Sequence, residues 1–413
     1  MTNNQPNRQQ RLAMKTQREA AEEYAAAVAY LRGRPDYHQV FDYFLEIAGQ
    51  PATAAAIGER SGRLVVEHLC NQAPLEIFHA LGAQPLRLAS GCCAAARLAD
   101  AALPALMCPL LRSTLGAQRL ADAASTALAR LIPTTCDWTV QFQELAGSLP
   151  APPIHFVELP HLRHSERGQA RFVEELFLLI DFLEEKIGRR LSRAALIASI
   201  NLYQEAWFVF ETIVALRRDG RLAAVWFAAI CATFMRDRVE HWLTAARPLV
   251  AHLQNVAPKP AVKPVFLCGS PIIFPNLKLL RLIEEAGMYA AADDLCASER
   301  LWPGGLAVHD RSLSGLVHAL AGRYHRACQC PTFADNERRF NSVRAAGLPF
   351  AGIISHVLKG CHPFDIESLG MERMARQAGI PFIRIETEYS PEDARTILTR
   401  LEAFAHIDTG EIA

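Results

Sequence analysis

The sequence predicts an α/β protein with two parallel-sheet domains, a helical block between them and a helical N-terminal extension. In two stretches, apolar strand-like segments alternate with amphipathic helices, a pattern typical of parallel sheets with right-handed crossovers. Proline-rich joints at 149–153 and 257–264 separate these stretches from the helices between them. A length of 413 residues also exceeds what one core usually holds. Each α/β stretch is therefore expected to be Rossmann-like or flavodoxin-like.

The residues before the second joint divide into three parts. Residues 1–55 are expected to form the extension, because apolar residues recur at helical spacing in YHQVFDYFLEIAG. Residues 56–164 are expected to form the first α/β domain, with a helix in LEIFHALG that ends at Gly82 and a short strand in QPLRLAS. Residues 165–258 are expected to form packed antiparallel helices, since RFVEELFLLIDFLEEKIG and the segment after it have helical apolar stripes.

Residues 259–413 are expected to form the second α/β domain. Four apolar segments of strand length lie between or near the helices KLLRLIEEAG, ERRFNSVRAAG and ESLGMERMARQAG. The predicted strands are 264–269, 287–296, 350–360 and 381–390. Ligands of open parallel sheets bind beyond the carboxyl ends of the strands, so functional residues are expected there.

Composition and charge argue against two classes of partner. The sequence balances 43 Lys and Arg residues against 43 Asp and Glu residues without a long run of one sign, so neither nucleic acid nor a membrane surface is an expected partner. The longest apolar stretch, 223–235, is shorter than the roughly 20 residues that cross a bilayer. The N-terminus lacks a signal-peptide pattern. We expect a cytoplasmic protein that binds small molecules or proteins.

Many of the eleven cysteines follow predicted strands or occupy loops. Cytosolic thiols are normally reduced, which leaves inert core residues, redox thiols or metal ligands. Cys231, within FAAICATF, is expected to be inert, because free cysteine is often simply buried. The cysteines at or near strand ends or in loops are Cys92, Cys93, Cys108, Cys136, Cys268, Cys296, Cys328, Cys330 and Cys361.

This placement suits an iron–sulfur cluster. Loops before helices offer free backbone N–H groups, which lower thiol pKa values and hydrogen-bond to sulfides. Zinc is the rival, but the sequence has no CxxC pairs of the kind that structural zinc sites use. It also lacks a P-loop, a GxGxxG fingerprint, an HExxH motif and a GxSxG elbow, so nucleotide hydrolysis within this chain is not expected.

Six segments in register resemble a known superfamily. They are GAQPLRL, CPLLRSTLG, TTCDW, ACQCPTFADNERR, FAGIISHVLKGCHPFDIESL and GIPFIRIETEYSPEDARTILTRLEAF. In this order they are similar to the 2-hydroxyacyl-CoA dehydratase subunits, benzoyl-CoA reductase subunits and double-cubane cluster proteins, over roughly residues 64–408. The chain departs from the pattern with Glu388 at a position that is more often aspartate, and with Trp138 in place of a glycine.

The resemblance implies a set of cluster ligands. Cys108, Cys136 and Cys361 match the three cysteines that hold one [4Fe-4S] cubane in dehydratase subunits. Cysteines at five further positions resemble the double-cubane branch, in which six cysteines hold an [8Fe-9S] cluster: Cys70, Cys268, Cys296, Cys328 and Cys330. For the second half of that cluster the resemblance suggests Cys296, Cys328 and Cys330, with Cys70 or Cys92 as substitutes.

The resemblance also implies an activity and partners. The expected enzyme is an oxygen-sensitive iron–sulfur oxidoreductase that receives electrons from a separate ATP-dependent [4Fe-4S] activator and reduces a small molecule, as a homodimer. Side chains that would assist at the cluster are His362, Glu386, Arg112 and Ser113. For His362, Arg112 and Glu386 a structural role is the competing interpretation: a turn cap, a surface ion pair and a solvated strand end, respectively.

Two alternatives to this reductase stay open at this stage. One is a subunit of a 2-hydroxyacyl-CoA dehydratase or benzoyl-CoA-type reductase with a single [4Fe-4S] cluster. The other is a non-catalytic electron-transfer protein. Iron stoichiometry separates the first alternative from the double-cubane reductase, because one cubane has about four irons and two have about eight.

Overall fold

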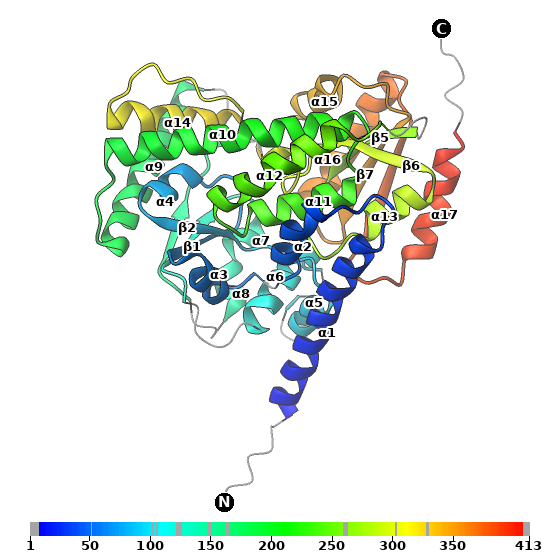
Figure 1. Cartoon of the computed structure of the whole chain (residues 1–413), viewed down its shortest axis with the longest axis horizontal. Helices are drawn as coiled ribbons and strands as arrows, with labels where there is room; N and C mark the ends of the chain where they lie inside the picture. Colours follow the sequence, from blue (N-terminus) through cyan, green and yellow to red (C-terminus); the bar gives the residue numbers. More distant parts are fainter. Residues whose placement is uncertain are drawn as a thin grey trace, which may run out of the picture.

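The computed structural model describes ten segments of the chain. They are residues 8–50, 52–100, 103–104, 106–120, 126–147, 151–161, 165–258, 263–301, 304–327 and 330–407. The structure has two four-stranded parallel sheets. In Figure 1 the first lies at the lower left and the second at the right, and long helices run across from one half to the other. The predicted fold class is thereby confirmed. Of the predicted ligands, Cys328 lies outside the described residues.

The first sheet has the strand order β2-β1-β3-β4, with every pair parallel. Its strands are β1 (Leu64–His68), β2 (Ala83–Arg87), β3 (Ala129–Pro133) and β4 (Ile154–Val157). The helices within this stretch are α3 (Ala54–Ser61), α4 (Leu75–Ala80), α5 (Cys93–Asp100), α6 (Pro109–Leu120), α7 (Asp137–Val140) and α8 (Phe142–Ala146). Alternating residues of β1 enter different cores: Val65 packs with Leu111 and Leu115, and Val66 packs on the opposite face.

The second sheet repeats this topology in the order β6-β5-β7-β8. Its strands are β5 (Lys263–Gly269), β6 (Met288–Asp293), β7 (Gly352–Leu358) and β8 (Phe382–Thr387). The accompanying helices are α13 (Lys278–Glu285), η2 (Glu299–Leu301), α14 (Leu313–Ala327), α15 (Asn336–Ala345), α16 (His362–Gln377) and α17 (Ala394–Ala405). The order 2-1-3-4 in both sheets is flavodoxin-like, with its switch point between the first and third strands.

Four helices form the block between the sheets, as the apolar stripes predict. They are α9 (Glu166–Ile187), α10 (Arg193–Arg218), α11 (Ala224–Phe234) and α12 (Val239–Gln254). Helix α10 spans both halves (Figure 1): Ser199 donates a hydrogen bond to the carbonyl of Glu76 in α4, 2.8 Å away, and Arg217 forms a 2.5 Å ion pair with Asp293 in β6. Both contacts are buried, so α10 fixes the two sheets relative to each other.

Helix α14 belongs to the second α/β stretch in sequence but packs in the first half of the molecule. Its residues Leu316 and Leu320 pack in the same core as Val66 of β1 and Phe172 of α9. Figure 1 shows α14 beside α9, away from the second sheet, whose strands β6 and β7 flank it in sequence. The second stretch therefore supplies a helix to the first half.

The N-terminal extension is helical, as predicted, and joins several elements. It comprises α1 (Arg8–Arg32), η1 (Gln39–Phe41) and α2 (Asp42–Ala48). Glu23 of α1 accepts hydrogen bonds of 2.7 Å from the N–H groups of Cys93 and Ala94 at the start of α5, and Arg34 forms a 2.7 Å ion pair with Glu284 of α13. Among the described residues, no helix combines the length and apolarity needed to span a bilayer.

Candidate metal centre

Three cysteines that the sequence places together, Cys108, Cys136 and Cys361, are named here the thiol triad. Each immediately precedes a helix: Cys108 precedes α6, and Cys136 and Cys361 are the N-cap residues of α7 and α16. Cys136 follows β3 and Cys361 follows β7, the third strand of each sheet. The triad therefore lies beyond the carboxyl ends of both sheets, where their topology places a ligand site.

Backbone N–H groups at these helix starts face the sulfur atoms of the triad. The donors are Leu110 and Leu111 for Cys108, Trp138 and Thr139 for Cys136, and Phe364 for Cys361. The Thr139 hydroxyl adds a 3.2 Å contact to the Cys136 sulfur. Free N–H groups and the helix macrodipole both stabilise negative charge at a helix N-terminus. The triad is therefore built to hold anionic sulfur.

The triad thiols interact directly with one another. A hydrogen bond between the Cys361 and Cys108 side chains lowers the pKa of Cys108, and this bond together with burial raises the pKa of Cys361 well above its usual range. Burial raises the pKa of Cys136, and the charge on Cys361 adds to this effect. The three sulfurs thus share one low-dielectric space in which a single cysteine takes the thiolate form first.

A glycine allows the two halves of the triad to approach each other. Gly360 has φ +73°, a conformation that disfavours other residues, and a Cβ built on it would lie 2.1 Å from the carbonyl oxygen of Leu106. The turn before Cys361 and the loop before Cys108 are consequently in backbone contact. No side chain can occupy this position without moving one thiol away from the other.

Cys296 and Cys330 form a separate pair, named here the second thiol group. Arg87, at the end of β2, donates to the Cys296 carbonyl at 2.6 Å and contacts its sulfur at 3.2 Å. Burial raises the pKa of Cys330, and the charge on Cys296 adds to this effect. Cys70 is near this group: its thiol contacts the Asn71 side chain, which in turn donates a hydrogen bond to the Arg300 carbonyl. The positive charge of Arg300 acts to lower the pKa of Cys330.

Arg87 is buried without an acidic partner. Its side chain is 4% exposed, and among the described residues no carboxylate lies within ion-pair distance of it. Its contacts are the Cys296 atoms and the Met235 sulfur at 3.5 Å. An unpaired buried charge costs several kcal/mol, so this region favours an anion.

The other cysteines occupy different surroundings. Cys92 is buried at the start of α5, where burial and the Glu23 charge raise its pKa to about 12. Cys268 falls inside β5, in a core with Phe266 and Phe340, and does not extend beyond the strand end. Cys231 is fully buried in the helical block, in keeping with an inert residue.

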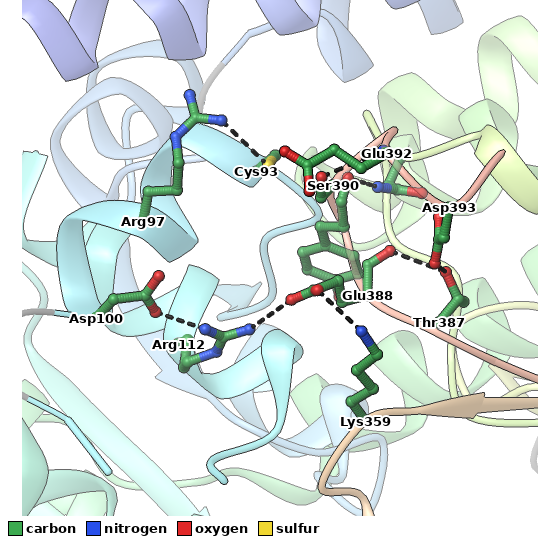
Figure 2. A network of polar contacts seen from close by, with 12 residues as sticks. Cys93, Arg97, Asp100, Arg112, Lys359, Thr387, Glu388, Ser390, Glu392 and Asp393 are labelled. Atoms are coloured by element: carbon green, nitrogen blue, oxygen red, sulfur yellow. Dashed lines mark hydrogen bonds and ion pairs between the residues drawn. The ribbon is translucent and has the colours of Figure 1, made fainter. Parts of the chain in front are cut away.

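Arg112, one of the side chains predicted to assist at the cluster, belongs to a network of ion pairs near the triad. It contacts Asp100 at 2.6 Å and Glu388 at 3.2 Å, and Glu388 also binds Lys359 at 3.1 Å. Figure 2 shows Glu388 between the two cations, which come from the helix after Cys108 and from the turn before Cys361. Both cations help to lower the pKa of Glu388. Arg112 therefore ties the two halves of the triad together.

The other predicted assisting residues point elsewhere. Ser113 is buried and donates to the Cys92 carbonyl at 2.8 Å, next to the Ser90 hydroxyl at 2.9 Å. His362 is exposed in the first turn of α16. Glu386 is exposed at the end of β8 and forms a 2.9 Å ion pair with Arg384. Their predicted roles at a cluster stay predictions.

Two residues that touch the thiols were missed by sequence reasoning. Arg87 lies at a strand end within the segment GAQPLRL, and Tyr389 lies in ETEYS. Tyr389 packs against Cys108 and Leu358. The available signal was their placement, Arg87 as the last residue of a strand and Tyr389 just beyond one.

The triad fits a cluster better than a single ion. Among the described residues, no group of three or more His, Cys, Asp or Glu side chains could hold a metal ion. A cubane brings its own sulfides, and its thiolates bind separate irons, so its ligands need not converge on one point. One buried and two half-buried cysteines at three helix starts fit that donor set.

These features define a two-sheet α/β protein with a thiol site between its halves, and sequence comparison gives its class. The chain belongs to the family described as 2-hydroxyglutaryl-CoA dehydratase, D-component, which it matches over residues 70–407. The resemblance noted from the motifs is thereby confirmed.

Three relatives illustrate the range of this family. Escherichia coli (strain K12) YjiM, provisionally named a dehydratase subunit, is 25% identical over 383 residues, which is 89% of this chain and 98% of YjiM. The (R)-phenyllactyl-CoA dehydratase beta subunit of Clostridium sporogenes is 24% identical over 311 residues, 73% of this chain and 80% of that relative. One of the subunits of benzoyl-CoA reductase from Thauera aromatica is 27% identical over 242 residues, 56% of this chain and 61% of that relative. These names favour the predicted alternative, an enzyme subunit, over a double-cubane reductase.

Proposed function

We propose that this chain is an iron–sulfur subunit of an enzyme that acts on CoA thioesters, with Cys108, Cys136 and Cys361 as the ligands of a [4Fe-4S] cluster. The observation that carries the proposal is the thiol triad itself. Its three sulfurs, from buried Cys108 and half-buried Cys136 and Cys361, come from both sheets, and each receives backbone N–H groups at a helix start. Family membership supports the choice of reaction class.

The chain's own residues would hold and shield the bound group. A cluster with three protein thiolates can supply one electron at a time and a Lewis-acidic iron. The helix starts of α6, α7 and α16 would offset its negative charge. Arg112, Glu388 and Lys359 would keep the two halves closed over it through their shared ion pairs.

The substrate class follows from the relatives. The names of two of them specify (R)-phenyllactyl-CoA and benzoyl-CoA, so a 2-hydroxyacyl-CoA or aryl-CoA thioester is the proposed substrate. Those relatives are named as subunits of larger enzymes. We accordingly propose that this chain works with a second subunit, or a second copy of itself, and with an ATP-dependent activator that supplies electrons, in the cytoplasm.

A double-cubane reductase of small molecules is the second candidate, and the second thiol group favours it. Arg87 is buried beside Cys296 without a carboxylate among the described residues, and an anionic cluster there would offset its charge. Cys296 and Cys330, with Cys328, Cys70 or Cys92, would complete the ligands. A non-catalytic electron-transfer protein would keep the triad but show no turnover.

Turnover assays test the proposal. Protein reconstituted with iron in the absence of oxygen is incubated with (R)-phenyllactyl-CoA or benzoyl-CoA. The mixture also contains ATP, a reductant, the activator and the proposed second subunit, both from the same organism as this chain. Thioester conversion that disappears in Cys108→Ser but persists in Cys231→Ala supports the proposal. Conversion that is equal in wild type and Cys108→Ser contradicts it.

A further inference from the structure

Tyr389 has a buried hydroxyl without a partner next to the thiol triad. It follows β8, its side chain is 6% exposed, and it packs on Cys108 and Leu358, with Cys361 at the edge of the same cluster. Among the described residues its hydroxyl oxygen has no hydrogen-bond partner. A buried donor left unpaired costs about 1–3 kcal/mol, so the position requires an explanation.

The backbone around Tyr389 is well fixed, so loose packing does not explain the unpaired hydroxyl. The Asn276 side chain donates to the Tyr389 carbonyl at 3.1 Å. On one side of Tyr389, the adjacent Glu388 is held by Arg112 and Lys359. The ring is therefore held in place by its neighbours while its polar end stays unsatisfied.

The neighbours of this hydroxyl suit an anionic acceptor. A phenolic O–H is a hydrogen-bond donor, and the Tyr389 side chain packs against Cys108, with Cys361 at the edge of the same cluster. Both cysteines stand at helix starts, where backbone N–H groups favour anionic sulfur. Anionic sulfur at these two positions would give the hydroxyl the acceptor that it lacks.

We propose that the Tyr389 hydroxyl donates a hydrogen bond to a sulfur atom of the cluster that the thiol triad holds. This inference rests on the proposed function and deepens it by naming a residue that adjusts the cluster. Reduction adds negative charge to the cluster, and a hydrogen bond to sulfur stabilises that charge. Tyr389 therefore raises the reduction potential and slows cluster loss.

A water molecule is the competing partner for the hydroxyl. A cavity of about 10 Å³ is lined by Tyr389, His356 and Glu388 among others, which is room for about one water. A water would satisfy the hydroxyl in the protein without iron, whereas a cluster would satisfy it only after loading. The two partners therefore predict opposite results for the iron-free protein.

The test compares Tyr389→Phe with wild type and a matched control, Tyr43→Phe. The Tyr43 hydroxyl donates to Asp237 at 2.9 Å, so this control removes a hydroxyl that already has a protein partner. Each protein is prepared without oxygen in iron-free and reconstituted forms. Three quantities are measured: the thermal midpoint of the iron-free form, the reduction potential by electron paramagnetic resonance titration, and the rate of iron release to a chelator.

The expected pattern separates the two variants. Iron-free Tyr389→Phe unfolds at or above the wild-type midpoint, because it loses only an unsatisfied group, whereas iron-free Tyr43→Phe unfolds below it. After reconstitution, Tyr389→Phe has a more negative reduction potential and releases iron about tenfold faster, as expected for a lost hydrogen bond to a charged acceptor. Tyr43→Phe matches wild type in both quantities.

Two outcomes overturn the inference, and they differ from failure of the proposed function. If reconstituted Tyr389→Phe keeps the wild-type potential and iron-release rate, the hydroxyl does not contact the cluster. If iron-free Tyr389→Phe unfolds well below wild type, a water or protein group already satisfies it. If the wild type itself binds no iron, the proposed function and this inference both fail.

Discussion

The two groups of thiols are stabilised in different ways. In the triad, every cysteine stands at the start of a helix and receives backbone N–H groups. In the second thiol group, the charged neighbour of Cys296 is the side chain of Arg87. The difference indicates that the backbone at helix starts stabilises every triad sulfur, whereas Cys296 depends on one substitutable side chain. Cys330 resembles the triad, because its sulfur receives the backbone N–H of Thr332.

The largest effect is expected from removing a triad thiol. Cys361→Ser should lose all the iron that the triad binds, because a serine oxygen is a poor substitute for a thiolate on iron. Iron per chain, measured after oxygen-free reconstitution, checks this. Cys231→Ala, in the helical core, is the control and should retain wild-type iron. Wild-type iron in Cys361→Ser would show that the triad is not a ligand set.

The triad can also be broken without touching a sulfur. Gly360→Ala should lower the free energy of unfolding by about 4 kcal/mol, because it combines a clash with the Leu106 carbonyl and a left-handed backbone conformation. Urea unfolding measures the change. Gly62→Ala is the matched control: Gly62 has φ +64° but open space around its Cβ, so it should lose only about 1 kcal/mol. Equal losses in the two variants would contradict a close approach at Gly360.

Two buried histidines make the free energy of unfolding depend on pH: the His68 ring hydrogen-bonds to the Cys70 carbonyl and the His356 ring to the Ser270 carbonyl. Burial lowers the pKa of His356 to about 4 and that of His68 to about 3. Below the unfolded pKa of about 6.5 the unfolded chain binds a proton at each site and the folded chain does not. Stability therefore falls as the pH falls from about 6.5, by about 3 kcal/mol from His356 at pH 4.

Urea unfolding at several pH values checks this dependence. The contribution of His356 should level off near pH 4, and that of His68 should continue to about pH 3. His356→Gln should therefore have a flatter profile than wild type between pH 6.5 and 4. An unchanged profile would mean that His356 is protonated in the folded protein.

Arg87 tests the second group separately. In iron-free protein, Arg87→Met should leave stability unchanged or raise it by about 1–2 kcal/mol, because it removes an unpaired buried charge. After reconstitution it should lose any iron bound at Cys296 and Cys330 and keep the iron of the triad. Arg87→Lys, which retains the charge, should keep more iron than Arg87→Met. Destabilised iron-free Arg87→Met would indicate that the contacts with Cys296 already satisfy the guanidinium.

The smallest effect is expected at the ion pairs over the triad. Glu388→Gln should cost about 1 kcal/mol or less, since its partners are partly exposed. Glu386→Gln, which affects only the exposed pair with Arg384, should cost less still. Thermal unfolding compares the two, and a larger loss in Glu386→Gln would exclude Glu388 as the link between the halves.

Local pattern was sufficient to predict much of the fold. The strands β5 to β8 and the helices α9 to α12 follow from apolar periodicity and from the flanking turns. The triad was predictable because each of its cysteines stands between a strand or loop and a helix, in a motif of the family. These features depend on residues close together in the sequence.

The features that could not be predicted depend on contacts between residues far apart in the sequence. Nothing near α14 in the sequence indicates that Leu316 packs beside Val66 of the first sheet. Likewise, the contact of Arg87 with Cys296 joins residues 209 positions apart. Cys268 lies near the end of its strand, as predicted, but its side chain is buried in a core with Phe266 and Phe340, which the local pattern does not reveal. Such contacts arise only when the two sheets are docked.

The central claim is tested most directly by measuring iron and acid-labile sulfide per chain. The protein is purified and reconstituted without oxygen, and Cys136→Ser and Cys296→Ser are measured in parallel. The account predicts at least about four irons in wild type, and a loss of about four in Cys136→Ser. If wild type holds about eight, Cys296→Ser should retain about four, and if it holds about four, Cys296→Ser should retain all of them. No iron in wild type, or wild-type iron in Cys136→Ser, would contradict a cluster at the triad.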